Sequence, residues 1–205
     1  MKILQILAHP DYNNKKRVSN LLAELGETEL RRKFSDFVTL NLYDPNCYIP
    51  IMDKNMFNYN DKELTYQETI DKARQEELLK IWKNSDLVFI YMPLHNFNVV
   101  SKFKDFIDNI VIVNETFKCE VETMVGLDNS NKQIMFVITS GGEFDSHIQY
   151  VNLDFAVQYV RGIFSVIGID KVKVIRSQGL DLVHNDKEEI VQKTKEELIE
   201  YINTL

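Results

Sequence analysis

An apolar run followed directly by two amides, an imidazole and a phenyl ring is the feature of this chain with the most specific chemistry. Residues 87–91 read LVFIY, without the alternation of a half-exposed strand, and this is typical of a parallel strand buried on both faces. Pro93 ends the run, and residues 94–98 read LHNFN. The amides of Asn96 and Asn98 and the backbone of such a loop can bind a planar polar heterocycle. We therefore expect a ligand site in residues 93–98.

Two side chains of this loop have alternative interpretations. Phe97 stands between the two asparagines, which favours a stacking surface for a ring, but it can also fold back onto the helix that follows. His95 can stack on a ligand or hydrogen-bond to it, whereas a lone loop histidine is more often solvated.

Basic residues end the segment before the first predicted helix. Residues 9–17 read HPDYNNKKR, and the helix is expected from about Val18. A helix N-terminus offers unpaired N–H groups and partial positive charge, and Arg17 and the Ser19 hydroxyl add donors. His9 can cap this helix or bind phosphate. The segment therefore predicts a phosphate site. A solvated charge run capped by Ser19 is the alternative, because the GxGxxG and GxxxxGK(S/T) motifs are both absent.

Hydroxyls and glycines follow the buried strand expected at residues 133–139. Thr139 and Ser140 precede Gly141 and Gly142, and glycines let a backbone approach a ligand closely. The alternative is a turn that requires positive φ. Ser140 is not a nucleophile of the GxSxG type, because that motif requires glycine where residue 138 is isoleucine. His147 closes this loop, where it can line a pocket.

Strand and helix patterns alternate along the whole chain. Strands are expected at residues 2–8, 37–42, 86–93, 133–139 and 171–175, with amphipathic helices between and after them. This alternation favours an α/β fold: a flavodoxin-like, doubly wound five-stranded parallel sheet of order 2-1-3-4-5 with helices on both faces. The chain of 205 residues suits a single domain spanning residues 1–205. At the switch point of this order, the loops at residues 9–17, 93–98 and 140–147 should converge.

Composition argues against several functional classes. A formal charge of −7 disfavours binding to nucleic acid, which needs a basic face. No apolar run approaches the ~20 residues of a membrane helix, and the N-terminus enters a strand without a signal-peptide pattern, so we expect a cytoplasmic protein with no membrane partner. Cys47 and Cys119 lack CxxC spacing, which favours reduced thiols. The four histidines lack the HExxH spacing of a zinc site, so no metal is expected.

The central loop also carries a family resemblance. Residues 92–98, which read MPLHNFN, followed by Lys104 and Asp108, resemble the PMYNFN…LK…D signature of the FMN-dependent NADH azoreductases, within the flavodoxin-like quinone reductase superfamily. The resemblance extends over nearly the whole chain and includes the ITSGG at residues 138–142. Three departures stand out. His95 replaces the tyrosine of the central motif, the first loop is longer than the usual serine-rich one, and Cys119 stands where relatives carry a tyrosine that lines the substrate pocket.

The resemblance implies a tightly bound FMN, with NADH or NADPH as co-substrate. It places the central loop at the flavin ring, residues 140–142 at the ring's polar edge, and the first loop near the phosphate. Together with His9, the predicted cofactor-binding residues are Arg17, Val18, Ser19, Pro93, Leu94, His95, Asn96, Phe97, Ser140, Gly141 and Gly142. The predicted substrate residues are Phe97, Phe117 and Cys119. No catalytic side chain is expected, because FMN carries the redox chemistry.

These expectations describe an oxidoreductase that transfers two electrons from NAD(P)H to a quinone or an azo compound by a ping-pong mechanism. The resemblance also implies a homodimer, and the apolar content of residues 43–60 and 116–131 suits a partner surface that covers the flavin. The alternative is a flavodoxin-type one-electron carrier without its own substrate site. A hydrolase finds no support, because the sequence shows neither a nucleophile triad nor a metal cluster.

Overall fold

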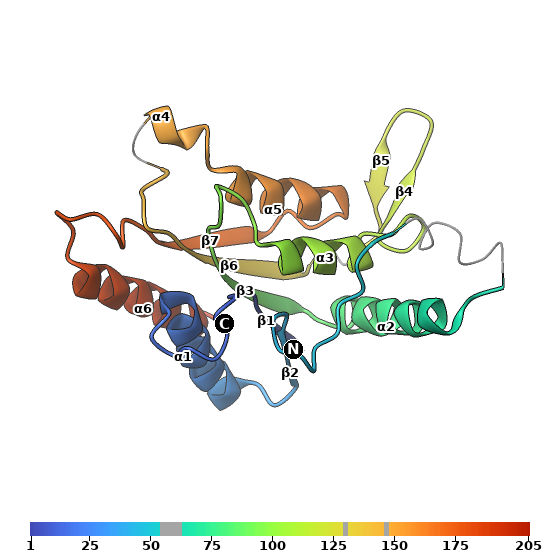
Figure 1. Ribbon diagram of the computed structural model, residues 1–205, viewed down its shortest axis with the longest axis horizontal. Helices are drawn as coiled ribbons and strands as arrows, with labels where there is room; N and C mark the ends of the chain where they lie inside the picture. The colour runs from blue at the N-terminus through green and yellow to red at the C-terminus, as the bar shows by residue number, and fades with distance from the viewer. Residues whose placement is uncertain (54–62, 129–130, 146–147) are drawn as a thin grey trace.

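A five-stranded parallel sheet forms the centre of the molecule (Figure 1). The computed structural model describes residues 1–53, 63–128, 131–145 and 148–205. The sheet has the order β2-β1-β3-β6-β7, which is the predicted 2-1-3-4-5 order of a flavodoxin-like fold. Its strands are β1 (Ile3–Leu7), β2 (Phe37–Asn41), β3 (Leu87–Pro93), β6 (Gln133–Thr139) and β7 (Val172–Ser177). The predicted fold class is therefore confirmed.

Helices cover both faces of the sheet. One face carries α1 (Val18–Lys33) and α6 (Lys187–Asn203), and the other carries α2 (Tyr66–Lys83), α3 (Ser101–Ile110) and α5 (Phe155–Val166). A short helix, α4 (Ile148–Val151), precedes α5 and was not predicted. Between α3 and β6, two short antiparallel strands form a hairpin, β4 (Phe117–Cys119) and β5 (Met124–Gly126). No helix among the described residues is long and apolar enough to cross a membrane.

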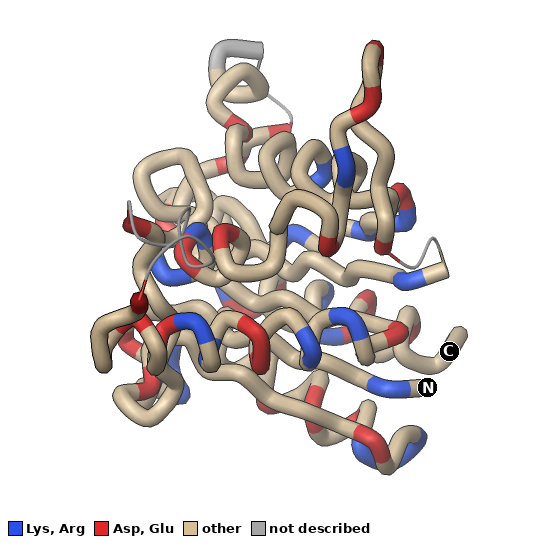
Figure 2. Tube along the Cα trace, turned by 90° about the vertical axis from the view of Figure 1, so that its right-hand side faces the viewer, with Lys and Arg blue, Asp and Glu red and all other residues tan. Residues whose placement is uncertain are grey.

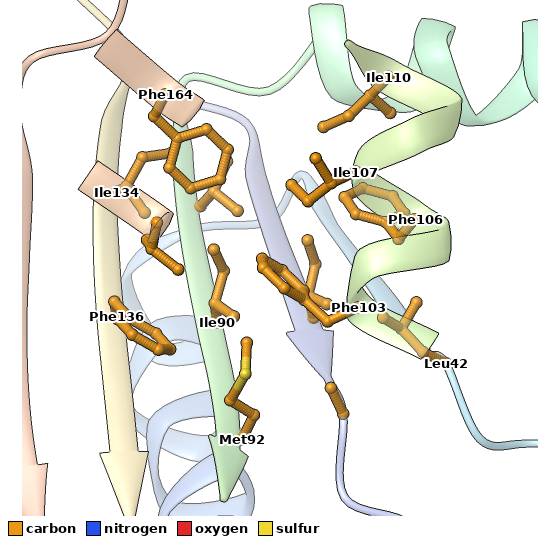
Figure 3. Close-up of a cluster of buried hydrophobic side chains, with 14 of the residues drawn as sticks. Leu42, Ile90, Met92, Phe103, Phe106, Ile107, Ile110, Ile134, Phe136 and Phe164 are labelled. Atoms are coloured by element: carbon orange, nitrogen blue, oxygen red, sulfur yellow. The ribbon is translucent and has the colours of Figure 1, made fainter. Parts of the chain in front are cut away.

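Strand β3 contributes to two hydrophobic cores because both of its faces are covered. Val88, Ile90 and Met92 pack with α2, α3 and α5, as Figure 3 shows for Ile90 and Met92. Phe89 and Tyr91, on the opposite face, pack against α1 and α6. This double burial explains why the run lacks alternation in the sequence. At its carboxyl end, the strand delivers Pro93 and the following loop to one edge of the sheet.

The carboxyl ends of the strands meet at this edge in register. Leu7 pairs with Tyr91, Pro93 with Thr139, and Thr139 in turn with Ser177. Since all strands are parallel, the loops after β1, β3, β6 and β7 leave the sheet side by side.

The β4–β5 hairpin lies at the opposite, amino-terminal edge of the sheet (Figure 1). It follows the end of α3, and Asp128 just after it donates its N–H to the carbonyl of Ile167, directly after α5, at 3.0 Å. Asp128 also forms a buried ion pair with Lys132 at 3.0 Å, and Lys132 Nζ donates to the carbonyl of Trp82 at 2.6 Å. These contacts fix the base of the hairpin at the amino-terminal edge of the five-stranded sheet, far from the carboxyl edge where the loops meet.

Charged residues of both signs are interspersed over the elements seen in Figure 2, and the two chain ends lie close together in both views. The hairpin projects from the body of the domain in both views. This intermixing of the two signs accompanies a net charge of −7.

Gly26 of α1 and Tyr91 of β3 provide a test of this packing. A Cβ on Gly26 would lie 2.0 Å from the Tyr91 hydroxyl oxygen, which is buried without a hydrogen-bond partner among the described residues. We expect Gly26→Ala to lower the free energy of unfolding by about 1–3 kcal/mol through overpacking. Tyr91→Phe should raise it by about 1 kcal/mol, because the buried hydroxyl lacks a partner.

In the Tyr91→Phe protein, Gly26→Ala should lower the free energy of unfolding by at least about 1 kcal/mol less than it does in the native chain. Urea unfolding of the four proteins measures this coupling. Additive effects of the two substitutions would contradict the described contact.

Candidate functional site

Four loops meet at the carboxyl edge of the sheet and enclose a polar pocket of about 230 Å³. The three predicted loops, after β1, β3 and β6, all contribute to it. The loop between β7 and α6 is the fourth, and it was not predicted. The lining residues are His9, Lys16, Arg17, Val18, Pro93, Leu94, Thr139, Ser140, Gly141, Leu180, Asp181 and Lys187. We call this the anion pocket, because three of these side chains are cations and only Asp181 is an acid.

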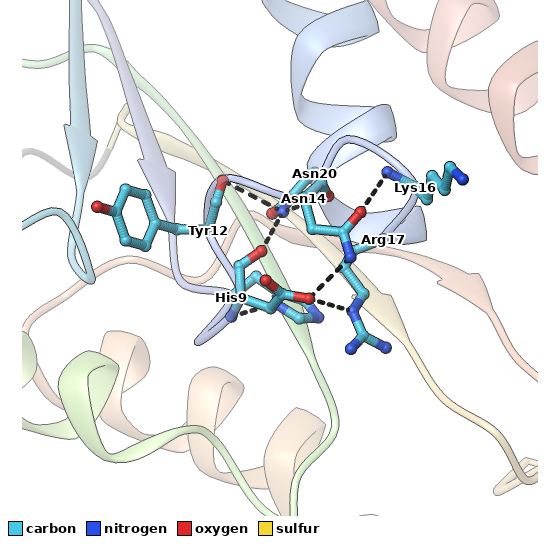
Figure 4. Close-up of polar contacts among 7 residues, drawn as sticks. His9, Tyr12, Asn14, Lys16, Arg17 and Asn20 are labelled. Carbon is cyan, nitrogen blue, oxygen red and sulfur yellow. Dashed lines mark hydrogen bonds and ion pairs between the residues drawn. The ribbon is translucent and has the colours of Figure 1, made fainter.

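The loop after β1 is held by its own polar side chains (Figure 4). Asp11 accepts from Arg17 Nε at 2.8 Å and from Asn14 Nδ2 at 2.8 Å, and both hydrogen bonds lower the pKa of the Asp11 carboxyl. Asn20 Nδ2 donates to the carbonyls of Asp11 at 2.9 Å and Asn14 at 3.0 Å. The arginine is thereby oriented through its Nε, which leaves the end of the guanidinium for a ligand.

His9 enters the pocket as a neutral ring. Its Nδ1 accepts the N–H of Asp11 at 2.9 Å, so this nitrogen carries no proton and the other ring nitrogen is a donor. Partial burial, and next the nearby Arg17 charge, lower the pKa of His9, although the Asp11 carboxylate opposes this. The imidazole therefore offers one N–H to the pocket near neutral pH.

The N-terminus of α1 is open to a ligand. Arg17 is the N-cap residue and no side chain caps the helix, so the alternative in which Ser19 caps it is wrong. The N–H groups of Val18, Ser19 and Asn20 belong to the first turn, which has no carbonyl partners inside the helix. The Ser19 hydroxyl is also buried without a partner among the described residues. Unpartnered donors at a helix N-terminus form a site for an anion such as phosphate.

The β6 loop is fastened to the β7 loop by three backbone hydrogen bonds. Leu180 N–H donates to Ser140 O at 3.1 Å, Asp181 N–H to Gly141 O at 3.1 Å, and Gly179 N–H to Gly142 O at 3.0 Å. The Ser140 hydroxyl donates to Gly142 O at 2.8 Å. A Cβ on Gly141 would lie 2.3 Å from the Asp181 carboxylate, so a larger residue here would displace this exposed side chain.

The β3 loop makes a tight two-residue turn. His95 and Asn98 exchange backbone hydrogen bonds of 3.1 and 3.0 Å, and the central residues Asn96 and Phe97 have φ angles of 47° and 63°. Asparagine tolerates left-handed backbone, whereas a bulky phenylalanine there is an outlier, and such outliers cluster at ligand sites. The turn leaves His95, Asn96 and Phe97 exposed at the rim of the site.

A second cavity of about 340 Å³ lies on the other side of the Gly141–Gly142 step. We call it the aromatic cavity. Phe97 and Gly142 belong to the predicted set, whereas the remaining lining residues do not: Glu143, Phe144, Tyr150, Leu182 and His184. His184 is exposed and lines this cavity.

The predicted cofactor residues thus lie together around the anion pocket and the turn beside it. The predicted substrate residues Phe117 and Cys119 do not, because their hairpin lies at the amino-terminal edge of the sheet. The expectation that they join Phe97 at a substrate slot shared by two copies of the chain stays a prediction. His147 lies outside the described residues.

The residues missed by the sequence interpretation include Leu180, Asp181 and Leu182 of the β7–α6 loop and Lys187, the first residue of α6. Strand β7 is the neighbour of β6 in the predicted order, so its loop also had to end at this edge. The predicted strand order was therefore the signal that could have identified this loop.

Among the described residues, no group of three potential ligands could hold a metal ion.

A doubly wound parallel sheet with its pocket at the switch point defines the flavodoxin-like class of α/β proteins. A family model described as a flavodoxin-like fold matches residues 1–202. The FMN-dependent NADH:quinone oxidoreductase 1 of Bacillus anthracis is 31% identical over 212 residues, covering 100% of this chain and 94% of that protein. Its counterpart in Lactiplantibacillus plantarum is 33% identical over 189 residues, covering 87% and 86%.

A crystal structure of a similar protein contains a flavin. The FMN-dependent NADH-azoreductase from Bacillus anthracis in complex with FMN superposes with a TM-score of 0.91 at 29% identity and covers 100% of this chain and 99% of that one. The chain therefore belongs to the flavodoxin-like fold family and, within it, to the family of the FMN-dependent NADH:quinone oxidoreductases and azoreductases.

The left-handed backbone at Phe97 generates a stability prediction. Phe97→Ala and Phe97→Gly both remove the ring, but only glycine adopts a φ of 63° without strain. The glycine variant should be more stable than the alanine variant by about 1 kcal/mol. Denaturant unfolding measures the difference.

Phe155, the first residue of α5, is a matched control because Phe97 and Phe155 are both 46% exposed. At this helical position, the Phe155→Ala variant should be more stable than the Phe155→Gly variant by about 0.5–1 kcal/mol. The same order of stability at both positions would contradict a strained turn.

Proposed function

We propose that this chain is an FMN-dependent oxidoreductase that transfers two electrons from NADH or NADPH to a quinone or an azo compound. The observation that carries the proposal is the meeting of an anion pocket at the α1 N-terminus with an exposed polar turn at the end of β3. A phosphate and a planar ring joined by a short chain fit this combination, because the two binding surfaces adjoin at Pro93 and Leu94.

The residues present fit an FMN phosphate. The buried Ser19 hydroxyl has no partner among the described residues and lies in the first turn of α1, where a dianion gains from the helix dipole. Arg17 and His9 add a charged and a neutral donor, and Val18 adds its backbone N–H. Lys16 and Lys187 line the same pocket and raise its positive charge.

The flavin ring would lie against the β3 loop. Pro93 and Leu94 offer a flat apolar wall, and the turn that follows presents His95, Asn96 and Phe97. Ser140, Gly141 and Gly142 would lie at the ring's polar edge, where glycine leaves the backbone accessible. These are the residues that we assign to the ring.

Bound FMN supplies the redox chemistry, because its ring accepts a hydride and passes two electrons to an acceptor. The chain would orient the ring and stabilise negative charge on it through the N–H groups of Gly141 and Gly142 and the Asn96 amide, since the Ser140 N–H already donates to the carbonyl of Ser177 at 2.9 Å. This is electrostatic preorganisation. No side chain of the chain needs to donate a proton, and none is assigned a catalytic role.

The exposed turn residues His95, Asn96 and Phe97 are the surface that we assign to both substrates. The nicotinamide nucleotide and the acceptor both have to stack at the same place, so the first must leave before the second enters. We therefore propose a ping-pong sequence.

We further propose that the active unit is a homodimer. Phe117 and Cys119 cannot reach the site of their own chain, so their proposed contact with the substrate requires a second copy. Val121 and Met124 of the projecting hairpin are exposed, which suits burial against a partner. Residues 43–53 form an irregular segment that includes exposed Ile51 and Met52, and residues 54–60 of the proposed interface segment lie outside the described residues.

The FMN proposal predicts that the purified protein is yellow and releases FMN on denaturation. Arg17→Met should weaken FMN binding by about 1.5–3 kcal/mol, because a charge-assisted hydrogen bond to phosphate is lost. That corresponds to roughly a 10- to 150-fold higher Kd. Riboflavin, which has no phosphate, should bind both proteins equally. Fluorescence titration of the apoproteins measures each Kd.

Lys15→Met is the control, because Lys15 pairs with Glu24 on the surface and does not line the pocket. Its Kd for FMN should stay within about twofold of the native value, since an exposed ion pair contributes little. An unchanged FMN affinity in Arg17→Met would contradict the phosphate site and support the alternative in which residues 15–17 are a solvated charge run.

The dimer proposal predicts a mass by light scattering of twice the 24.1 kDa of one chain. Phe97→Ala should lower acceptor turnover more than FMN content, because the exposed ring borders the slot, whereas Phe155→Ala should change neither. A monomer with full NADH-dependent quinone reductase activity would contradict the shared site.

A further inference from the structure

We infer that the aromatic cavity binds a neutral or cationic aromatic ring of the electron acceptor and that the Glu143 carboxylate excludes anionic ones. The inference deepens the proposed function and rests on it for the identity of the occupant. It concerns a cavity whose walls lie mostly outside the predicted cofactor residues.

Three aromatic rings and a leucine form the cavity. The Phe97 and Phe144 ring centroids are 6.0 Å apart with planes at 75°, and those of Phe144 and Tyr150 are 6.3 Å apart at 70°. Such edge-to-face contacts leave ring faces and edges for a further aromatic group. Leu182 completes the apolar wall. A volume of about 340 Å³ lies at the small end of the range for small-molecule sites and suits two fused rings.

The Glu143 carboxylate is held at the rim. Asn185 Nδ2 donates to Glu143 Oε1 at 3.0 Å and to the carbonyl of Gly179 at 3.1 Å. Gly179 has a φ of 75°, and a Cβ there would lie 2.3 Å from Asn185 Nδ2 and 2.8 Å from Glu143 Oε1. Glycine is therefore required for this contact, which positions the negative charge beside the apolar walls.

The charges of the site are divided between its two cavities. The anion pocket is lined by three cations, Lys16, Arg17 and Lys187. The described lining of the aromatic cavity contains one acid, Glu143, and one histidine, His184. An anionic substituent in the aromatic cavity is repelled at short range by a carboxylate of reduced hydration. A phosphate is thus drawn to one cavity and an uncharged ring to the other.

The test uses two ligands of the same shape, the β isomers of naphthamide and naphthoate, titrated calorimetrically into the FMN-loaded protein at about pH 8, where histidine side chains are generally neutral. The amide should bind at least about tenfold more tightly than the carboxylate. Glu143→Gln should reduce this ratio to about twofold or less, whereas Asp145→Asn, a charge removal in the same loop but outside the cavity lining, should keep it.

Leu182→Trp should weaken both ligands at least about tenfold by filling the cavity, without loss of bound FMN. Salt should lower the amide-to-carboxylate ratio of the native protein, which keeps the test decisive if Glu143→Gln does not fold. Equal binding of the two ligands to the native protein, or an unchanged ratio in Glu143→Gln, would overturn the inference.

Two further outcomes separate this inference from the proposed function. Naphthamide that binds only the apoprotein and is displaced by FMN would show that the flavin fills the cavity, which overturns the inference alone. A protein that takes up no FMN overturns the proposed function, and titration of the same two ligands into it still decides the charge selectivity of the cavity.

Discussion

Burial of β3 on both faces determines where the functional loops of this chain can lie. Its alternate residues enter two separate cores, so a shift by one residue would exchange the side chains of the two cores and disrupt the packing of both. The neighbouring strands are parallel and in register with it, and their carboxyl ends are therefore level. The anion pocket follows from this constraint, because loops from four strands have to leave the sheet at one edge.

Hydrogen bonds within and between these loops then fix the chemistry of the site. Asp11 and Asn20 hold the first loop so that Arg17 and the open helix end face the same pocket. The β6 and β7 loops are joined backbone to backbone, which places the Gly141–Gly142 step between two cavities of different character. A preformed site of this kind orients a cofactor at little conformational cost.

Periodicity in the sequence was sufficient to predict the sheet order and the three loops that meet at its switch point. It was also sufficient for residues such as Arg17 and Pro93, whose positions follow from where an element begins or ends. Lys187 and Phe144 were not found, because their approach to the site depends on loop conformation rather than on spacing. Phe117 and Cys119 were matched by resemblance, which does not say in which copy of the chain a residue acts.

The central claim is that this chain binds FMN and that its own substrates reduce and reoxidise it. The most direct test is an anaerobic titration of the purified holoprotein with NADH, or with NADPH in parallel, followed by addition of a quinone. One equivalent of the nucleotide should bleach the visible flavin absorbance, and one equivalent of quinone should restore it. A protein without flavin absorbance even after incubation with FMN, or a flavin that neither nucleotide bleaches, would contradict the central claim.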